Sequence, residues 1–157
     1  MELLVRVNGA EQKFEISPGD LLVDVLRQAG YLSVKVGCRT GDCGTCTIIL
    51  DGQAINCCLM LAAQANGKEI VTIEGLASEN RLHPLQEQFL EQGAVQCGFC
   101  IPGMILSAKV LLDENPNPRE GQVREVLGGN LCRCTGYEKP VQAVLAAAQV
   151  MRGGGGS

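Results

Sequence analysis

Hydrophobic and polar positions alternate along the first part of the chain. Apolar side chains occupy every second position on either side of a short break, at Leu3, Val5, Val7, Phe14 and Ile16. A period of two is typical of a strand with one buried face. The break contains Asn8-Gly9, and both residues tolerate the positive φ of a two-residue hairpin turn. The pattern therefore predicts an antiparallel hairpin over residues 1–16.

The spacing becomes helical after a second break, with apolar residues at Leu21, Leu22, Val25 and Leu26. We expect Asp20 to cap this helix at its N-terminus and Gly30 to end it. Three short strands follow in the pattern, at 47–50, 53–57 and 69–73. An Asp51-Gly52 turn joins the first two. Strands of this length with one helix among them predict a small mixed α+β unit.

Past Gly75 the apolar stretches have helical spacing. Four helices are predicted, at 84–90, 104–112, 118–127 and 140–151. Asn117 is the expected N-cap of the third, because Pro118 follows it and Glu120 lies three positions after it. The fold class is therefore α+β, with a four-helix domain in second place. We predict domains over 1–76 and 77–152, followed by a flexible Gly/Ser tail over 153–157.

Composition and charge narrow the range of possible functions. The chain has 157 residues, nine cysteines and a formal net charge of −4. No basic stripe is present, which argues against nucleic acid as a partner. No apolar run approaches the roughly 18–20 residues of a membrane span, and the first residues lack the features of a secretory signal. We therefore expect a cytoplasmic protein. Its odd cysteine count fits a disulfide framework poorly and favours metal ligation.

The first cysteine set lies in a glycine-rich loop. Cys38, Cys43 and Cys46 follow the spacing C-x4-C-x2-C, and two more cysteines stand at positions 57 and 58. This is the plant-type ferredoxin spacing for a [2Fe–2S] cluster. A four-cysteine zinc site is the alternative, but such sites usually show two short pairs. Spacing alone leaves open whether Cys57 or Cys58 is the fourth ligand.

The second cysteine set lies in the helical half. Cys97 and Cys100 form a CxxC pair, and Cys132 and Cys134 form a CxC pair. Both pairs fall at predicted helix ends, where the backbone is free to turn inward. The four thiolates predict a metal site, and spacing alone fits zinc nearly as well as an iron–sulfur cluster. The second pair argues against a simple redox dithiol.

Four segments carry a resemblance to a known family. They occur in the order CRTGDCGTC (38–46), NCCL (56–59), QCGFCIPGM (96–104) and GNLCRCTGY (129–137). Together they resemble the small iron–sulfur subunit of the xanthine oxidase family of molybdenum hydroxylases, over residues 2–152. The resemblance implies a β-grasp ferredoxin-like domain followed by a four-helix domain. It also implies a [2Fe–2S] cluster at each cysteine set.

The resemblance further implies the ligands. Cys58 directly precedes Leu59, as the fourth ligand of the first cluster does in the family, so Cys57 is implied to be a non-ligand. The implied first-cluster ligands are Cys38, Cys43, Cys46 and Cys58. The implied second-cluster ligands are Cys97, Cys100, Cys132 and Cys134.

Partners are also implied by the resemblance. They are a molybdopterin-binding large subunit and an FAD-binding medium subunit, in a dimer of heterotrimers. Gln96 and Cys134 are implied to approach the pterin, while the first cluster faces the flavin. Electrons would then pass from molybdenum through the second and first clusters to FAD. The chain would be a non-catalytic electron-transfer subunit of an oxidoreductase.

Two other functions compete with this interpretation. A free-standing two-cluster ferredoxin would be a stable soluble monomer, and a zinc-stabilised interaction module would be colourless. Among single residues, we expect the only histidine, His83, to be solvated or to cap a helix. Arg39 and Arg133 lie inside the cysteine loops, and we expect them to form surface or interface salt bridges.

Overall fold

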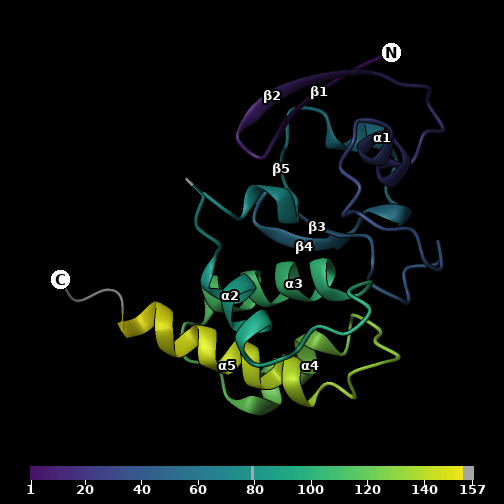
Figure 1. The fold of residues 1–157 in the computed structure, drawn as a ribbon. Coiled ribbons are helices and arrows are strands. Elements are labelled where there is room, and N and C mark those ends of the chain that lie inside the picture. The colour runs from purple at the N-terminus through teal and green to yellow at the C-terminus, as the bar shows by residue number, and fades with distance from the viewer. Residues whose placement is uncertain (79, 154–157) are drawn as a thin grey trace.

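A computed structural model describes residues 1–78 and 80–153, with a sheet in the first half of the chain and helices in the second (Figure 1). Five strands form one mixed sheet in the order β2-β1-β5-β3-β4. Their bounds are Glu2–Val7 (β1), Ala10–Glu15 (β2), Thr47–Leu50 (β3), Gln53–Asn56 (β4) and Glu69–Val71 (β5). The helices are Leu22–Gln28 (α1), Pro84–Glu91 (α2), Ile101–Glu114 (α3), Glu120–Leu127 (α4) and Glu138–Gly153 (α5).

Both predicted hairpin turns are present. β1 pairs antiparallel with β2, and β3 pairs antiparallel with β4. Asn8 and Gly9 have φ of 51° and 81°, and Asp51 and Gly52 have 47° and 83°. These left-handed conformations turn the chain in two residues, and their twist matches that of the flanking strands. β5 then enters between the hairpins, parallel to β1 and antiparallel to β3.

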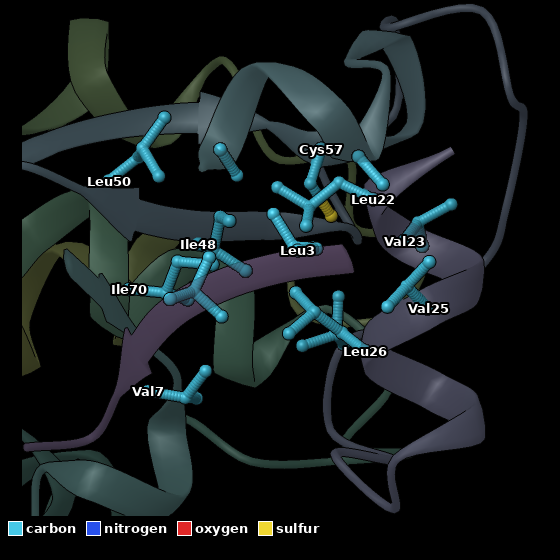
Figure 2. Packing of buried hydrophobic residues seen from close by; sticks show 14 of the residues in the cluster. Leu3, Val7, Leu22, Val23, Val25, Leu26, Ile48, Leu50, Cys57 and Ile70 are labelled. Carbon is cyan, nitrogen blue, oxygen red and sulfur yellow. The ribbon is translucent and has the colours of Figure 1, made fainter. Parts of the chain in front are cut away.

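The core of the first half lies between the sheet and α1 (Figure 2). Alternate residues of β1 face it, as the period of two predicts, and Ile48 and Ile70 come from the central strands. Leu22 and Leu26 of α1 pack against them and are fully buried. The sulfur of Cys57 lies in this same core, between Leu3 and Leu22 in the view.

Two predicted helix caps are wrong. The N-cap of α1 is Leu21, because the Asp20 carboxylate instead accepts the Ser17 N–H at 2.7 Å and closes the preceding turn. The N-cap of α4 is Arg119 rather than Asn117. Its backbone N–H donates to the Gln122 side chain at 2.9 Å, so a glutamine satisfies this helix end.

Several element bounds also differ from the prediction. β4 ends at Asn56, because a short 3-10 helix begins at Cys57. β5 ends at Val71, because another 3-10 helix begins two residues later, at Ile73. α3 begins at Ile101, three residues earlier than predicted, with Pro102 in its first turn where the missing N–H costs nothing. α5 is longer at both ends than predicted.

The helical half has its own core and packs under the sheet. Leu85, Phe89, Met104 and Val144 belong to this second apolar cluster. α3 contacts β3 and β4 directly (Figure 1). The domain boundary near residue 76 stays a prediction. Of the expected tail, Gly153 is the last residue of α5, and 154–157 lie outside the described residues. In the described part of the chain, no helix is long and apolar enough to cross a bilayer.

Candidate metal centres

The loop before β3 directs donors at its own first cysteine. The backbone N–H groups of Thr40 and Cys43 donate to Cys38 Sγ at 3.3 and 3.4 Å. The Thr40 hydroxyl and these N–H groups stabilise the thiolate, which lowers the pKa of Cys38 to about 6. Deprotonated sulfur is the form that binds metal. The loop is therefore electrostatically prepared for an anionic sulfur site.

The remaining thiols of the first set lie around the end of β4. Cys58 is hydrogen-bonded to the side chain of Cys46 and interacts electrostatically with Cys38. Burial, followed by these contacts, raises the pKa of Cys58. Cys43 in turn is hydrogen-bonded to Cys38. Cys38 thus interacts with Cys43, and Cys46 interacts with Cys58. These are the four residues that the resemblance implies as ligands, and their role as ligands stays a prediction.

Cys57 is placed differently from its neighbour. Its side chain is fully buried, and its Sγ donates to the backbone carbonyl of Cys46 at 2.9 Å. A hydrogen bond with the Cys46 side chain, followed by burial, raises the pKa of Cys57 strongly, so it remains a neutral thiol. The same thiol stabilises ionised Cys46 and lowers the pKa of that residue to about 6. Cys57 therefore supports the loop from within the core.

A salt bridge attaches the first loop to α1. Arg39 has φ of 58° and makes two bonds to the Asp24 carboxylate, at 2.9 and 2.7 Å. The guanidinium lowers the pKa of Asp24. The expected salt bridge of Arg39 is therefore present, and it lies at the surface. Two parallel bonds also hold the loop in one orientation.

The second cysteine set forms two contacts between its loops. Burial, followed by a hydrogen bond with Cys132, raises the pKa of Cys100 to about 12. A hydrogen bond with Cys97 raises the pKa of Cys134. Each thiol of the CxxC pair therefore faces one thiol of the CxC pair. Thr135 supports Cys132 further, with its backbone N–H donating to the sulfur at 3.4 Å.

Each cysteine pair is followed by a long helix. α3 starts at Ile101, next to Cys100, and α5 starts four residues after Cys134. The positive end of the α3 dipole therefore lies beside Cys100, where it favours negative charge. The loop between the CxC pair and α5 is closed by Tyr137, whose hydroxyl accepts the Cys132 N–H and donates to the Asn130 carbonyl, both at 2.9 Å.

The arrangement of thiols bears on which metal fits. The thiols of the second set lie in two interacting pairs. A [2Fe–2S] cluster binds two thiolates at each of two irons, whereas structural zinc gathers four ligands at one ion. The pairwise arrangement fits the binuclear cluster.

The two sites differ in exposure. Cys97 and Cys134 are exposed, and so is Gln96 beside them. Cys46 and Cys58 are buried. Apolar side chains are also exposed next to the second set, with Phe99 at 46% and Leu131 at 54%. The outer edge of the second site therefore presents sulfur and apolar surface to its surroundings.

Sequence reasoning missed a residue that joins the two sites. Asn130 is 1% exposed, and its side-chain amide donates to the Gly44 carbonyl at 2.9 Å and to Thr47 Oγ1 at 3.2 Å. Next to it, the Leu131 N–H donates to the Cys43 carbonyl at 2.9 Å. The only signal in the sequence is a polar residue between Gly129 and the CxC pair, and nothing there identifies its partners.

Comparison with known proteins matches both halves of the chain. Residues 5–76 match the 2Fe-2S iron-sulfur cluster binding domain family, and residues 72–145 match the [2Fe-2S] binding domain family. The nicotinate dehydrogenase small FeS subunit of Eubacterium barkeri is 47% identical over 146 residues, which cover 92% of this chain and 93% of that protein.

Two further proteins are similar to this chain over most of its length. The xanthine dehydrogenase iron-sulfur-binding subunit of Escherichia coli O157:H7 is 47% identical, covering 88% of this chain and 89% of that one. A crystal structure of quinoline 2-oxidoreductase from Pseudomonas putida 86 contains a chain that superposes with a TM-score of 0.94 at 44% identity. That match covers 98% of this chain and 97% of the other.

Proposed function

This chain belongs to the family of small [2Fe–2S] iron–sulfur subunits of molybdenum hydroxylases, and on that premise we propose that its two cysteine sets hold the two clusters through which it relays electrons. The proposed ligands of the first cluster are Cys38, Cys43, Cys46 and Cys58. Those of the second are Cys97, Cys100, Cys132 and Cys134. The observation that carries this assignment is that backbone N–H groups in both cysteine loops are directed at cysteine sulfurs, at Cys38 in the first loop and at Cys132 in the second.

The chain's own residues prepare both sites for negative charge. When bound, each cluster accepts and releases single electrons. Backbone N–H groups directed at Cys38 and Cys132 stabilise the ligand sulfurs, and such bonds raise the reduction potential of a cluster. Burial of Cys46 and Cys58 excludes water from the inner side of the first site. The exposed Cys97 and Cys134 leave the second site open at its outer edge.

A bonded connection links the two proposed sites within the chain. The Cys43 carbonyl accepts the Leu131 N–H, and Leu131 is covalently joined to Cys132. One hydrogen bond and a few covalent bonds therefore separate a ligand of one set from a ligand of the other. This continuity suits a subunit that carries electrons from one face of the molecule to another.

The surroundings of the chain are part of the same proposal. We place a molybdopterin-binding subunit against the exposed edge formed by Gln96, Cys97 and Cys134, with Phe99 and Leu131 as apolar contacts. We place an FAD-binding subunit beside the first site, where Leu59 is 61% exposed. Assembly as a dimer of heterotrimers in the cytoplasm completes the proposal. The names of the relatives support a subunit of a larger oxidoreductase.

A matched pair of variants tests the ligand assignment. Cys58→Ser removes a proposed ligand, whereas Cys57→Ser changes only the adjacent buried thiol. We expect anaerobically purified Cys57→Ser to hold about four irons, as two binuclear clusters require. Cys58→Ser should lose or alter the first cluster alone. Iron and sulfide assays, visible absorption and EPR after dithionite reduction measure both outcomes.

The contrary results are distinct. A Cys57→Ser protein that loses the first cluster while Cys58→Ser keeps it would reverse the assignment of the fourth ligand. A wild-type protein that is colourless, holds zinc and lacks sulfide would exclude the relay function in that form. A stable native monomer that copurifies with no molybdenum or flavin subunit would instead favour the free-standing ferredoxin.

A further inference from the structure

Asn130 is a buried amide whose polar atoms all have partners. Its Nδ2 donates to the Gly44 carbonyl and to Thr47 Oγ1, 2.9 and 3.2 Å away. Its Oδ1 accepts from Ser107 Oγ of α3 at 2.9 Å. The first two bonds cross to the sheet half of the molecule, and the third stays within the helical half. A buried amide satisfied in this way resists displacement, because a shift leaves polar groups unpaired.

The backbone around this amide is packed to contact. Gly44 has φ of 70°, and a Cβ added there would lie 2.2 Å from the Gly129 carbonyl oxygen. A Cβ added to Gly103 of α3 would lie 2.6 Å from the Gly44 carbonyl oxygen. Segments from the first cysteine loop, the second cysteine loop and α3 therefore meet at one point. The three segments have Gly44, Gly129 and Gly103 at this point, and the missing side chains allow the backbones to come this close.

The position of Asn130 relates it to both cluster sites. Gly44 follows Cys43 in the first loop, and Leu131 lies between Asn130 and Cys132 in the second. The Leu131 N–H bond to the Cys43 carbonyl runs beside the Asn130 bonds. Any change in the Asn130–Gly44 contact therefore alters the bonded connection between the two ligand sets.

We propose that Asn130 is a positioning residue for electron transfer between the two clusters. By holding Gly44 against the second loop, it fixes the separation and orientation of the cluster sites, and with them the rate of transfer. In this step one electron leaves the reduced cluster of one site and reduces the oxidised cluster of the other, and no atom or proton moves. The inference rests on the proposed ligand assignment.

The test compares two substitutions that remove different bonds of the same amide. Asn130→Asp keeps the size of the side chain but turns the donor toward Gly44 into an acceptor, so two oxygens face each other. Ser107→Ala is the matched control, because it removes only the bond within the helical half. Both are made in the full chain and loaded with clusters. Iron and sulfide content and circular dichroism establish that each variant is intact.

Two measurements report on the geometry between the sites. The magnetic splitting between the two reduced clusters in EPR falls steeply with their separation. The rate of electron equilibration after pulsed one-electron reduction measures the transfer itself. We expect Asn130→Asp to diminish the splitting and slow equilibration while both reduced signals persist. Ser107→Ala leaves both bonds to the sheet half in place, so it should change both measurements less than Asn130→Asp does.

Asn130→Asp with two intact clusters, unchanged splitting and unchanged equilibration would overturn the proposal. Should Asn130→Asp lose a cluster, Thr47→Val decides, because it removes the β3 hydroxyl that accepts from Asn130 and donates to Gly44. A diminished splitting in Thr47→Val supports the proposal, and a wild-type splitting refutes it. A wild-type chain without about four irons would contradict the ligand assignment itself, and this inference with it.

Discussion

A single histidine closes the first turn of α2. His83 is the N-cap, and its Nδ1 accepts the Leu85 N–H at 3.2 Å, which confirms the expected capping role. Burial, followed by the charge of Lys109, lowers the pKa of His83, although Asp113 and Glu87 oppose this. The acceptor nitrogen is free only in the neutral ring, so the cap and the lowered pKa favour the same protonation state.

This coupling gives a pH dependence of defined sign. Because folding lowers the pKa of His83, the unfolded chain binds the proton more readily, and stability decreases as pH falls below the ordinary histidine pKa of about 6.5. Above that pH the ring is neutral in both states and the contribution is fully present. His83→Asn keeps a cap without titrating, so its stability should change less between neutral and mildly acidic pH. Denaturant unfolding of both proteins measures the difference.

The cap itself is tested by His83→Ala at neutral pH. Loss of an N-cap costs about 0.5–2 kcal/mol, and His83→Asn should recover most of it. Equal stability of the alanine and asparagine variants would show that the hydrogen bond to Leu85 contributes nothing. A wild-type protein no more sensitive to acid than His83→Asn would contradict the pH argument.

At the scale of elements, α3 depends on a glycine. A Cβ on Gly103 would lie 2.6 Å from the Gly44 carbonyl oxygen and 2.8 Å from the side-chain Nδ2 of Asn130. Neither atom is the free end of a flexible side chain, so α3 must shift. Gly121 in α4 is the matched control, because a Cβ there meets nothing within 4 Å.

Alanine at these two positions should have opposite effects. Gly121→Ala stabilises by about 0.5–1 kcal/mol, because alanine loses less entropy in a helix. Gly103→Ala has the same helical gain but overpacks the contact with the first loop, at a cost of about 1–3 kcal/mol. Thermal and denaturant unfolding measure both. A stabilised Gly103→Ala protein would mean that the two halves are less closely packed than described.

The elements that could be predicted are those with local causes. Asn8-Gly9 and Asp51-Gly52 predict their hairpins because the turn conformation depends on those residues alone. Asp20 as a cap fails because a closer donor, the Ser17 N–H, takes its carboxylate. The α4 cap fails because the Gln122 side chain replaces Asn117 at that helix end.

In the candidate sites, too, only features with a local cause could be predicted from the sequence. Spacing identifies the cysteines because their separation along the chain is itself the signal. Spacing does not decide whether Cys57 or Cys58 is the fourth ligand of the first site, because adjacent residues differ only in the direction that the fold gives their side chains. Asn130 cannot be found from the sequence, because Gly44 and Thr47 lie 86 and 83 residues away from it.

At the scale of the whole molecule, two small halves share one contact region. Each half has its own apolar cluster, but aromatic residues make up only 3% of the chain. Small domains bury a limited fraction of their surface and often rely on metal or covalent links. The cysteine loops adjoin the contact region through Gly44 and Leu131. Cluster binding and stability are therefore expected to be coupled.

Removal of the clusters should show this coupling. We expect a chelated, cluster-free chain to unfold at a lower temperature than the loaded chain. Amide exchange should rise most in residues 37–46, 97–100 and 130–137, and least in β1 and β3. Hydrogen–deuterium exchange of both forms measures the distribution. Equal protection of the three loops in the two forms would mean that the protein fold alone holds the cysteines in place.

The central position of β5 determines the order in which the molecule can be assembled during synthesis. β5 is the last strand in the chain, yet it pairs with both β1 and β3. Until residue 71 has left the ribosome, the two hairpins have no common neighbour. α3 is synthesised after β5, so it can pack on a finished sheet. The first cysteine loop therefore emerges before the strand that joins the two hairpins, and we expect cluster insertion to follow closure of the sheet.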